Sequence, residues 1–370
     1  TLPLLQRLDN GVKVKNNHIR SLVLVPTREL AVQVAENVST YGKYLSLKYA
    51  VVYGGVTINP QMMKLRSGID VLVATPGRLL DLYQKNSVRL SQLETIVLDE
   101  ADRMLDMGFI EDIGKIISFV PVKRQTLLFS ATFSDYIRKL SKSVLKNPVE
   151  IEGHPRNSTA KNVQQIVYEV DKTRKAALLI RLIQNKGWSQ VLVFVRTKKG
   201  ADQLVTRLER DKILAAAIHG DKTQGQRSRT LARFKENNLR VLIATDLASR
   251  GLDISELPCV INFDLPKVSE EYIHRIGRTG RAGSEGEAIS LVSADEVRLL
   301  SAIETLTRQL LAREVETGFV PIHSVPITKL TKIRPKKPKK IQQHLRDHET
   351  AKSKNDQPTS TKKTRRAGLL

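Results

Sequence analysis

Two segments of the sequence combine residue types that could act on phosphate groups. In the first, Asp99-Glu100-Ala101-Asp102, three acids follow directly on the apolar run 95–98. If that run is a strand, its end presents carboxylates that could hold a Mg²⁺ ion and the nucleotide phosphates bound to it. The same acids would also stabilise the N-terminus of a helix without any metal, through the helix macrodipole. The tetrad therefore predicts either a metal–nucleotide site or a helix start.

The second segment, His274-Arg275-Ile276-Gly277-Arg278-Thr279-Gly280-Arg281, places three arginines and a histidine around two glycines. Guanidinium groups match phosphate oxygens in pairs, and the glycines let the backbone turn so that several arginines converge on one anion. A basic surface loop that binds any polyanion is the alternative. Further candidates, which could equally be helix caps, lie between the two segments: Ser130, Thr132, Thr245, Asp246, Arg250, Gly251 and Asp253.

The apolar pattern predicts a scaffold that brings these segments together. Short β-branched runs recur, each followed by a longer helical pattern, which is typical of a parallel sheet covered by helices. Ligands of open parallel sheets collect at the carboxyl ends of the strands, so the polar residues directly after each run are the site candidates. Strands are expected at 22–25, 49–53, 71–74, 95–98 and 126–129, and again at 166–170, 191–195, 215–218, 241–244, 260–263 and 288–292.

The predicted fold class is α/β, with two tandem domains that each contain a parallel sheet. We expect the first domain over residues 1–151, a linker over 152–162, the second domain over 163–322 and a basic tail over 323–370. The linker is rich in Pro, Gly, Asn, Ser and Thr and has no apolar periodicity. The tail is rich in Pro and Lys, a composition that cannot bury enough surface to fold by itself, and it is expected to be disordered.

The charge of the chain favours nucleic acid as a partner, because its net +23 attracts polyanions. Residues 329–370 hold 14 Lys or Arg against 3 Asp or Glu, about half of the excess. That tail is either a solvated end or an RNA-contacting arm. No apolar run approaches the roughly 20 residues that span a bilayer. With no secretory pattern and a single cysteine, Cys259, expected in the core, we predict a cytoplasmic protein without a membrane partner.

The order of the short motifs carries a resemblance to a known family. Read forward, the chain gives Pro26-Thr27-Arg28-Glu29-Leu30, Gly54-Gly55, Thr75-Pro76-Gly77-Arg78, the tetrad at Asp99, Ser130-Ala131-Thr132, Phe194-Val195-Arg196-Thr197, Ala244-Thr245-Asp246, Gly251-Leu252-Asp253 and the segment at His274. Over about residues 1–319, this series resembles the motifs of the DEAD-box ATP-dependent RNA helicases in order and spacing. The stretches 54–62 and 98–109 look most like the bacterial RhlE type.

The resemblance implies two RecA-like domains that close over ATP and RNA together. Glu100 would orient or deprotonate the attacking water, and Asp99 would hold Mg²⁺ through its water shell. Arg278 and Arg281 would act as arginine fingers, and Asp253 would bind the ribose. Further implied nucleotide-site residues are Asp102, Ser130, Thr132, Gly251, His274 and Arg275. Implied RNA contacts, made to sugar and phosphate rather than to bases, are Thr27, Arg28, Gly55, Thr75, Gly77, Arg78, Arg196, Thr197, Thr245, Asp246 and Arg250.

The function implied is local, ATP-driven unwinding or remodelling of RNA duplexes with little sequence specificity. One motif departs from the family, because the loop G-x-x-x-x-G-K-[ST], whose amides cradle phosphates, is absent. The two Gly-Lys pairs are followed by Tyr44 and Ile116 instead of Ser or Thr. We therefore expect a sequence cut inside the first domain and little ATPase activity from these residues alone.

Two other functions stay open at this point. The chain could be a non-catalytic RNA-binding protein, or a DNA-directed motor of a related superfamily. The sequence identifies neither the physiological RNA, nor ribonucleoprotein or RNA-degradation partners, nor the oligomeric state.

Overall fold

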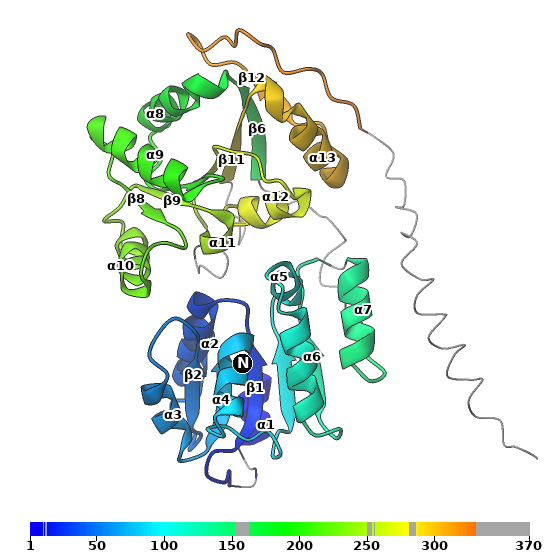
Figure 1. Cartoon of the computed structure of the whole chain (residues 1–370). Coiled ribbons are helices and arrows are strands. Elements are labelled where there is room, and N and C mark those ends of the chain that lie inside the picture. Colours follow the sequence, from blue (N-terminus) through cyan, green and yellow to red (C-terminus); the bar gives the residue numbers. More distant parts are fainter. Residues whose placement is uncertain are drawn as a thin grey trace, which may run out of the picture. The chain divides into compact units, whose positions relative to one another are not determined.

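The computed structural model describes residues 1–9, 11, 13–132, 134–151, 163–249, 254, 256–280 and 286–330. Residues 1–330 form one compact unit. The predicted linker, 152–162, and the tail from residue 331 onward lie outside the described residues. The described part contains two sheets, each flanked by helices (Figure 1).

The first sheet has five parallel strands in the order β2-β3-β1-β4-β5. The strands are β1 (Ile19–Leu24), β2 (Tyr49–Val52), β3 (Ile69–Ala74), β4 (Thr95–Leu98) and β5 (Gln125–Leu128). The helices are α1 (Leu2–Leu8), α2 (Arg28–Tyr41), α3 (Asn59–Leu65), α4 (Pro76–Gln84), α5 (Ala101–Asp106), α6 (Ile110–Phe119) and α7 (Asp135–Val144).

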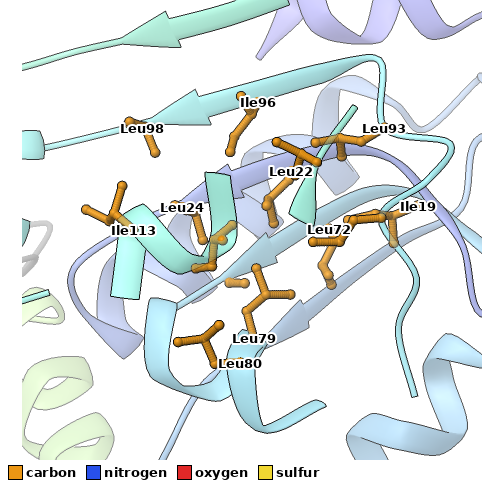
Figure 2. Packing of buried hydrophobic residues seen from close by; sticks show 14 of the residues in the cluster. Ile19, Leu22, Leu24, Leu72, Leu79, Leu80, Leu93, Ile96, Leu98 and Ile113 are labelled. Carbon is orange, nitrogen blue, oxygen red and sulfur yellow. The ribbon is translucent and has the colours of Figure 1, made fainter. Parts of the chain in front are cut away.

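Both faces of this sheet are covered, so its central strands are buried along their whole length. Every residue of β1 and of β3 is buried. Because successive side chains of a strand point to opposite faces, Leu22 and Leu24 join one core cluster and Val23 joins the other. Figure 2 shows the first cluster, in which the strand leucines pack against Leu79 of α4 and Ile113 of α6. This packing fixes the strand ends that carry the candidate site.

The second sheet has seven parallel strands in the order β12-β6-β11-β10-β7-β9-β8. Its strands are β6 (Val163–Glu169), β7 (Val191–Phe194), β8 (Ala215–Ile218), β9 (Val241–Ala244), β10 (Cys259–Asn262), β11 (Gly286–Val292) and β12 (Ala312–Glu314). The helices are α8 (Lys175–Lys186), α9 (Lys198–Arg210), α10 (Gln224–Lys235), α11 (Asp246–Ser249), α12 (Ser269–Ile276) and α13 (Val297–Thr307), with the 3₁₀ turns η1 (Lys172–Arg174) and η2 (Ala294–Glu296).

The predicted α/β class with two parallel-sheet domains is confirmed, and every predicted strand run overlaps an observed strand. One observed strand, β12, does not correspond to any predicted run. Its three residues are partly or fully exposed, so it leaves no apolar run and is held by backbone pairing to β6. Cys259 lies fully buried in β10, as expected of a core residue. None of the helices in the described ranges is long and apolar enough to cross a membrane.

Candidate nucleotide and RNA site

The acidic tetrad occupies the turn between β4 and α5, at the carboxyl edge of the first sheet. The Asp99 backbone N–H continues the ladder to the Leu24 carbonyl at 3.0 Å, and the next peptide then turns sharply. Glu100 has φ 50° and ψ 50°, in the left-handed region, and its N–H donates to Asp99 Oδ1 at 2.9 Å. A residue other than glycine in that region costs on the order of 1–3 kcal/mol and persists only where its surroundings impose it. The turn therefore stores strain at the predicted reaction centre.

Both leading carboxyls of the tetrad are shielded from water. Burial raises the pKa of Asp99 above its ordinary value. Burial likewise raises the pKa of Glu100, against the opposing charges of Arg103 and Arg278. Glu100 Oε2 is buried without a hydrogen-bond partner and lies 3.6 Å from Arg103 Nε. A desolvated carboxylate with an oxygen that makes no hydrogen bond is suited to accept a proton from a substrate water.

Asp102 joins the tetrad to the predicted Ser130–Thr132 motif. It is 5% exposed, and its Oδ2 accepts from both the backbone N–H and the Oγ1 of Thr132, each at 2.8 Å. Ser130 Oγ donates to the Thr132 carbonyl at 2.7 Å. The His274 Nε2 atom lies 3.8 Å from Asp102 Oδ2. Burial and the nearby Arg103 lower the pKa of His274, which favours the neutral ring.

Asp99 is the residue that could hold a divalent cation. Among the residues that the structure describes, no group of three or more His, Cys, Asp or Glu has a metal-binding arrangement. Mg²⁺ usually keeps several waters and binds through one or two carboxylates together with substrate phosphates. A single desolvated carboxylate at the strand end fits that mode, in which the ion is held through its water shell.

Three strand ends of the first sheet bring together the predicted RNA contacts of that domain. Thr27 caps α2, since its Oγ1 accepts from the Leu30 N–H at 3.3 Å. Gly55 has φ +74° and lies against the Arg28 guanidinium, so that a Cβ there would come within 2.1 Å of Arg28 Nη2. A side chain at position 55 would displace Arg28. Thr75 precedes α4, and Gly77 lies in its first turn.

Arg78 is less accessible than a direct RNA contact would suggest. It is 8% exposed, and its Nη2 donates to the Val56 carbonyl at 2.9 Å. Its Nε and Nη1 are buried without hydrogen-bond partners, although Nε lies 3.7 Å from Asp81 Oδ2. In this geometry the guanidinium supports the loop after β2.

In the second sheet, Arg275 and Asp246 are brought together at the carboxyl edge. The Arg275 Nε and Nη2 atoms donate to the two carboxylate oxygens of Asp246 at 2.6 and 2.8 Å. Its Nη1 donates to Asn262 Oδ1 at 3.0 Å and to the Asp264 carbonyl at 2.7 Å. With 2% exposure, Arg275 is a buried tie between α12 and the ends of β9 and β10.

The remaining candidates of this edge lie on neighbouring strand ends. Arg196 follows β7, and its backbone N–H donates to Asp264 Oδ2 at 2.8 Å. Thr197 caps α9 by accepting from the Gly200 N–H at 3.0 Å. Thr245 follows β9 and is 8% exposed. Arg278 follows α12, and its charge opposes the rise that burial causes in the pKa of Glu100. Four predicted residues lie outside the described residues: Arg250, Gly251, Asp253 and Arg281.

Three residues with contacts at this site were not among the predicted ones. Glu29 Oε1 accepts from Arg227 Nη2 at 2.8 Å and from Gln224 Nε2 at 3.2 Å. Glu29 belongs to the Pro26–Leu30 motif, whereas α10 contains none of the motifs in the series. The available signal was the start of α10, where Thr223 and Gln226 form a capping box and place Gln224 and Arg227 three residues apart on one face.

Comparisons with known proteins agree with this geometry. Residues 1–140 match the sequence profile of the DEAD/DEAH box helicase family, and residues 174–283 match that of the helicase conserved C-terminal domain. The chain is 44% identical over 307 residues to the ATP-dependent RNA helicase RhlB of Pseudomonas syringae pv. tomato, covering 82% of this chain and 76% of RhlB. It is 43% identical over 302 residues to the DEAD-box ATP-dependent RNA helicase CshA of Geobacillus kaustophilus, covering 82% of this chain and 65% of CshA.

Solved structures give the same result. The chain superposes on Saccharomyces cerevisiae Dbp5 bound to RNA and ADP BeF3 with a TM-score of 0.73 and 31% identity, covering 85% of this chain and 81% of that one.

Several curated relatives are considerably longer than this chain, which spans 59% of the length of CshA of Bacillus cereus. The relatives named here do not single out the RhlE type, which stays a prediction. The chain belongs to the DEAD-box RNA helicase family.

Proposed function

We propose that the protein remodels RNA duplexes locally, driven by the hydrolysis of ATP with Mg²⁺, and that it does so in the cytoplasm. The observation that carries the proposal is the turn after β4, where a desolvated, strained Glu100 lies beside Asp99 and is followed by Asp102. Strain and raised carboxyl pKa values in one turn are costly to a fold and are typical of reaction centres. Membership of a helicase family supplies the reaction class.

Each residue of the turn has a distinct role in this proposal. Bound Mg-ATP supplies the electrophilic phosphoryl group. Glu100 would accept a proton from the attacking water at Oε2, which makes no hydrogen bond, and Asp99 would hold Mg²⁺ through its water shell. Asp102 couples the conformation of the turn to that of Thr132 through two hydrogen bonds of 2.8 Å. Arg278 and Arg281 provide positive charge for the transition state.

RNA is the proposed partner, bound through its sugars and phosphates. The candidate contacts lie at strand ends of the first sheet (Thr27, Gly55, Thr75) and of the second (Arg196, Thr245). Dbp5, to which the chain is similar in fold, was solved with RNA and ADP BeF3. The excess of basic residues in 329–370 adds an attraction that depends on salt but not on sequence.

A second candidate function rests on the missing phosphate loop. The sequence contains no G-x-x-x-x-G-K-[ST], and Asp99 and Glu100 alone do not cradle a triphosphate. Residues 1–370 by themselves are therefore expected to turn over little ATP. On this alternative, they act as a non-catalytic RNA-binding protein.

ATP hydrolysis with and without single-stranded RNA separates the two functions. The chain is compared with a version extended at its amino end by a segment that carries the loop, and with that extended version bearing Glu100→Gln. The matched control is Glu36→Gln, an exposed glutamate of α2 in the same domain. We expect RNA-stimulated turnover only in the extended proteins with Glu100 intact, and a loss of roughly 100- to 10,000-fold in Glu100→Gln. RNA binding without turnover in every version would favour the alternative.

A further inference from the structure

The carboxyl edge of the second sheet buries an acidic residue for which the proposed reaction gives no role. Glu296 ends the η2 turn after β11 and is 5% exposed. Its Oε2 accepts from Lys175 Nζ, and from the N–H and Oγ of Ser293 at 3.3 and 3.2 Å. Its Oε1 accepts from Arg196 Nη2 at 3.0 Å and from the Leu265 N–H at 3.4 Å. The carboxylate thus connects four separate segments.

Local structure accounts for only part of this set of bonds. Ser293 and Glu296 form a capping box, which explains the two bonds within the turn. Lys175 is 2% exposed and also donates to the Phe263 carbonyl at 2.9 Å, so a carboxylate is needed to neutralise it. The capping box and the neutralisation of Lys175 both use Glu296 Oε2. Neither requires Oε1 to meet an arginine that lies 100 residues earlier in the chain.

Arg196 is held from several sides. Its backbone N–H donates to Asp264 Oδ2, and its Nη2 donates to Glu296 Oε1 and, at 3.4 Å, to the Leu265 carbonyl. Its side chain is nevertheless 35% exposed. The other guanidinium nitrogens, Nε and Nη1, make no hydrogen bond to residues that the structure describes. One side of the guanidinium is therefore fixed inward, and the remaining N–H groups are left for an anion.

We propose that Glu296 is a positioning residue, which holds the Arg196 guanidinium so that its remaining N–H groups meet an RNA phosphate. The inference rests on the proposed RNA contact of Arg196. Long flexible side chains lose conformational freedom on binding, and a side chain already held in place loses less. Arginine gains most from such fixing because its planar fork must match the phosphate oxygens in direction as well as in charge.

Positioning and simple charge predict opposite signs for one substitution. Glu296→Gln removes a negative charge from a face proposed to bind a polyanion, so charge alone predicts tighter RNA binding. Loss of positioning predicts weaker binding, by about three- to tenfold, the effect of losing one hydrogen-bonded restraint. The matched control is Glu287→Gln, the same charge change on β11, at the end away from Glu296.

Two readouts on residues 1–370 test the proposal. The mobility of the Arg196 side chain is measured by nitrogen-15 relaxation of its Nε–H without RNA, and affinity for a single-stranded RNA is measured by fluorescence anisotropy. We expect a more mobile Arg196 and a weaker affinity in Glu296→Gln, with neither change in Glu287→Gln. Arg196→Met should weaken binding, and adding Glu296→Gln to it should cause no further loss.

The outcomes separate failure of the inference from failure of the proposed function. A rigid Arg196 in Glu296→Gln, or unchanged or tighter RNA binding there while Arg196→Met weakens it, overturns the positioning role. Full affinity in Arg196→Met overturns the RNA contact itself, whereas mobility is read without RNA. If Glu296→Gln fails to fold because Lys175 is left unpaired, the double variant Lys175→Met/Glu296→Gln removes both buried charges. Its Arg196 mobility and RNA affinity are then measured and judged in the same way.

Discussion

Both sheets carry polar side chains at their carboxyl edges, but the hydrogen bonding of these side chains is more complete in the second sheet than in the first. At the first edge, Glu100 has a left-handed backbone and a buried oxygen without a hydrogen-bond partner. At the second, Arg275 makes four hydrogen bonds through its three guanidinium nitrogens. Glu296 accepts from Lys175, Arg196, Leu265 and Ser293. Glu100 at the first edge is therefore left incompletely bonded, whereas Arg275 and Glu296 at the second edge are fully paired.

This difference indicates what each edge is prepared to do. A buried charge is costly unless a partner of opposite sign and hydrogen bonds accompany it. The second edge alternates cations and anions, so its geometry is fixed before any ligand arrives. At the first edge, the neighbouring acid Asp102 raises the pKa of Asp99 further, beyond the effect of burial. That edge gains stability when a cation binds, which agrees with the proposed Mg²⁺.

The largest expected effect comes from breaking the Arg275 network of the second edge. Arg275→Met leaves Asp246 and Asn262 without their buried donor, and removing one partner of a buried pair typically costs about 3–5 kcal/mol. We expect the free energy of unfolding of the second domain to fall by about that amount in urea denaturation. Arg207→Met, an exposed arginine of α9, is the control and should change it little. A loss below about 1 kcal/mol in Arg275→Met would contradict the view that this edge is a rigid frame.

A smaller loss is expected at Asp102, a well-bonded acid of the first edge. Asp102→Asn removes the charge that accepts both bonds from Thr132. Hydrogen bonds to charged groups contribute about 1.5–3 kcal/mol, and we expect unfolding free energy to fall within that range. Hydrogen exchange at the Thr132 amide should speed up, with exposed Asp135→Asn as the control. Unchanged exchange at Thr132 would show that the two motifs are not coupled through Asp102.

The opposite sign is expected at Glu100. Its folded pKa is raised, so ionisation opposes folding; the penalty is absent below the unfolded pKa and complete above the folded pKa. Glu100→Gln should therefore stabilise the protein near pH 7 on the order of 1 kcal/mol, the scale of one unsatisfied buried polar atom. The gain should disappear on acidification below about pH 4. Thermal unfolding across this pH range, with Glu36→Gln as control, measures it; a gain independent of pH would contradict the argument.

The strands and the order of motifs could be predicted because they depend on local pattern. Short apolar runs predicted the carboxyl-terminal parts of β1 and β3, and the acids at 99–102 are adjacent in sequence. The family resemblance named Asp102, Thr132 and His274 only as nucleotide-site residues, a role that stays a prediction; in the structure Asp102 bonds to Thr132 and lies near His274. Both pairs lie within 3.8 Å in the structure.

The contacts that escaped prediction depend on which strands become neighbours. Glu296 meets Arg196 because β10 pairs with both β11 and β7, and Leu265, just beyond β10, bonds to both side chains. No spacing in the sequence encodes that neighbourhood. The left-handed backbone of Glu100 was equally hidden, because glycine would be the ordinary residue for such a turn. Both features are set by tertiary structure rather than by local propensity.

The smallest expected effect concerns the segment that follows β12. The carboxylate of Asp171 accepts from the Ile322 N–H at 3.2 and 3.0 Å and from the His323 N–H at 3.4 Å, and these bonds lower its pKa. Because its pKa is depressed, the ionised Asp171 stabilises this segment fully above the unfolded-state pKa of about 3.9. This stabilisation is lost as the pH falls through the folded-state pKa. At neutral pH, Asp171→Asn should speed hydrogen exchange at residues 322 and 323 without changing the thermal unfolding of either domain.

Acidification of the unsubstituted protein should have the same local effect once intrinsic exchange rates are corrected for pH. Asp211→Asn, an exposed aspartate just after α9, is the matched control and should leave both amides unchanged. Arg174 remains stacked on Phe319, 4.8 Å from its ring centroid, so the segment should loosen only from Ile322 onward. If exchange instead rises throughout residues 315–330, Asp171 anchors the whole segment. The local stability of a part of the second domain would then depend on one charge, as it does in the turn at Glu100.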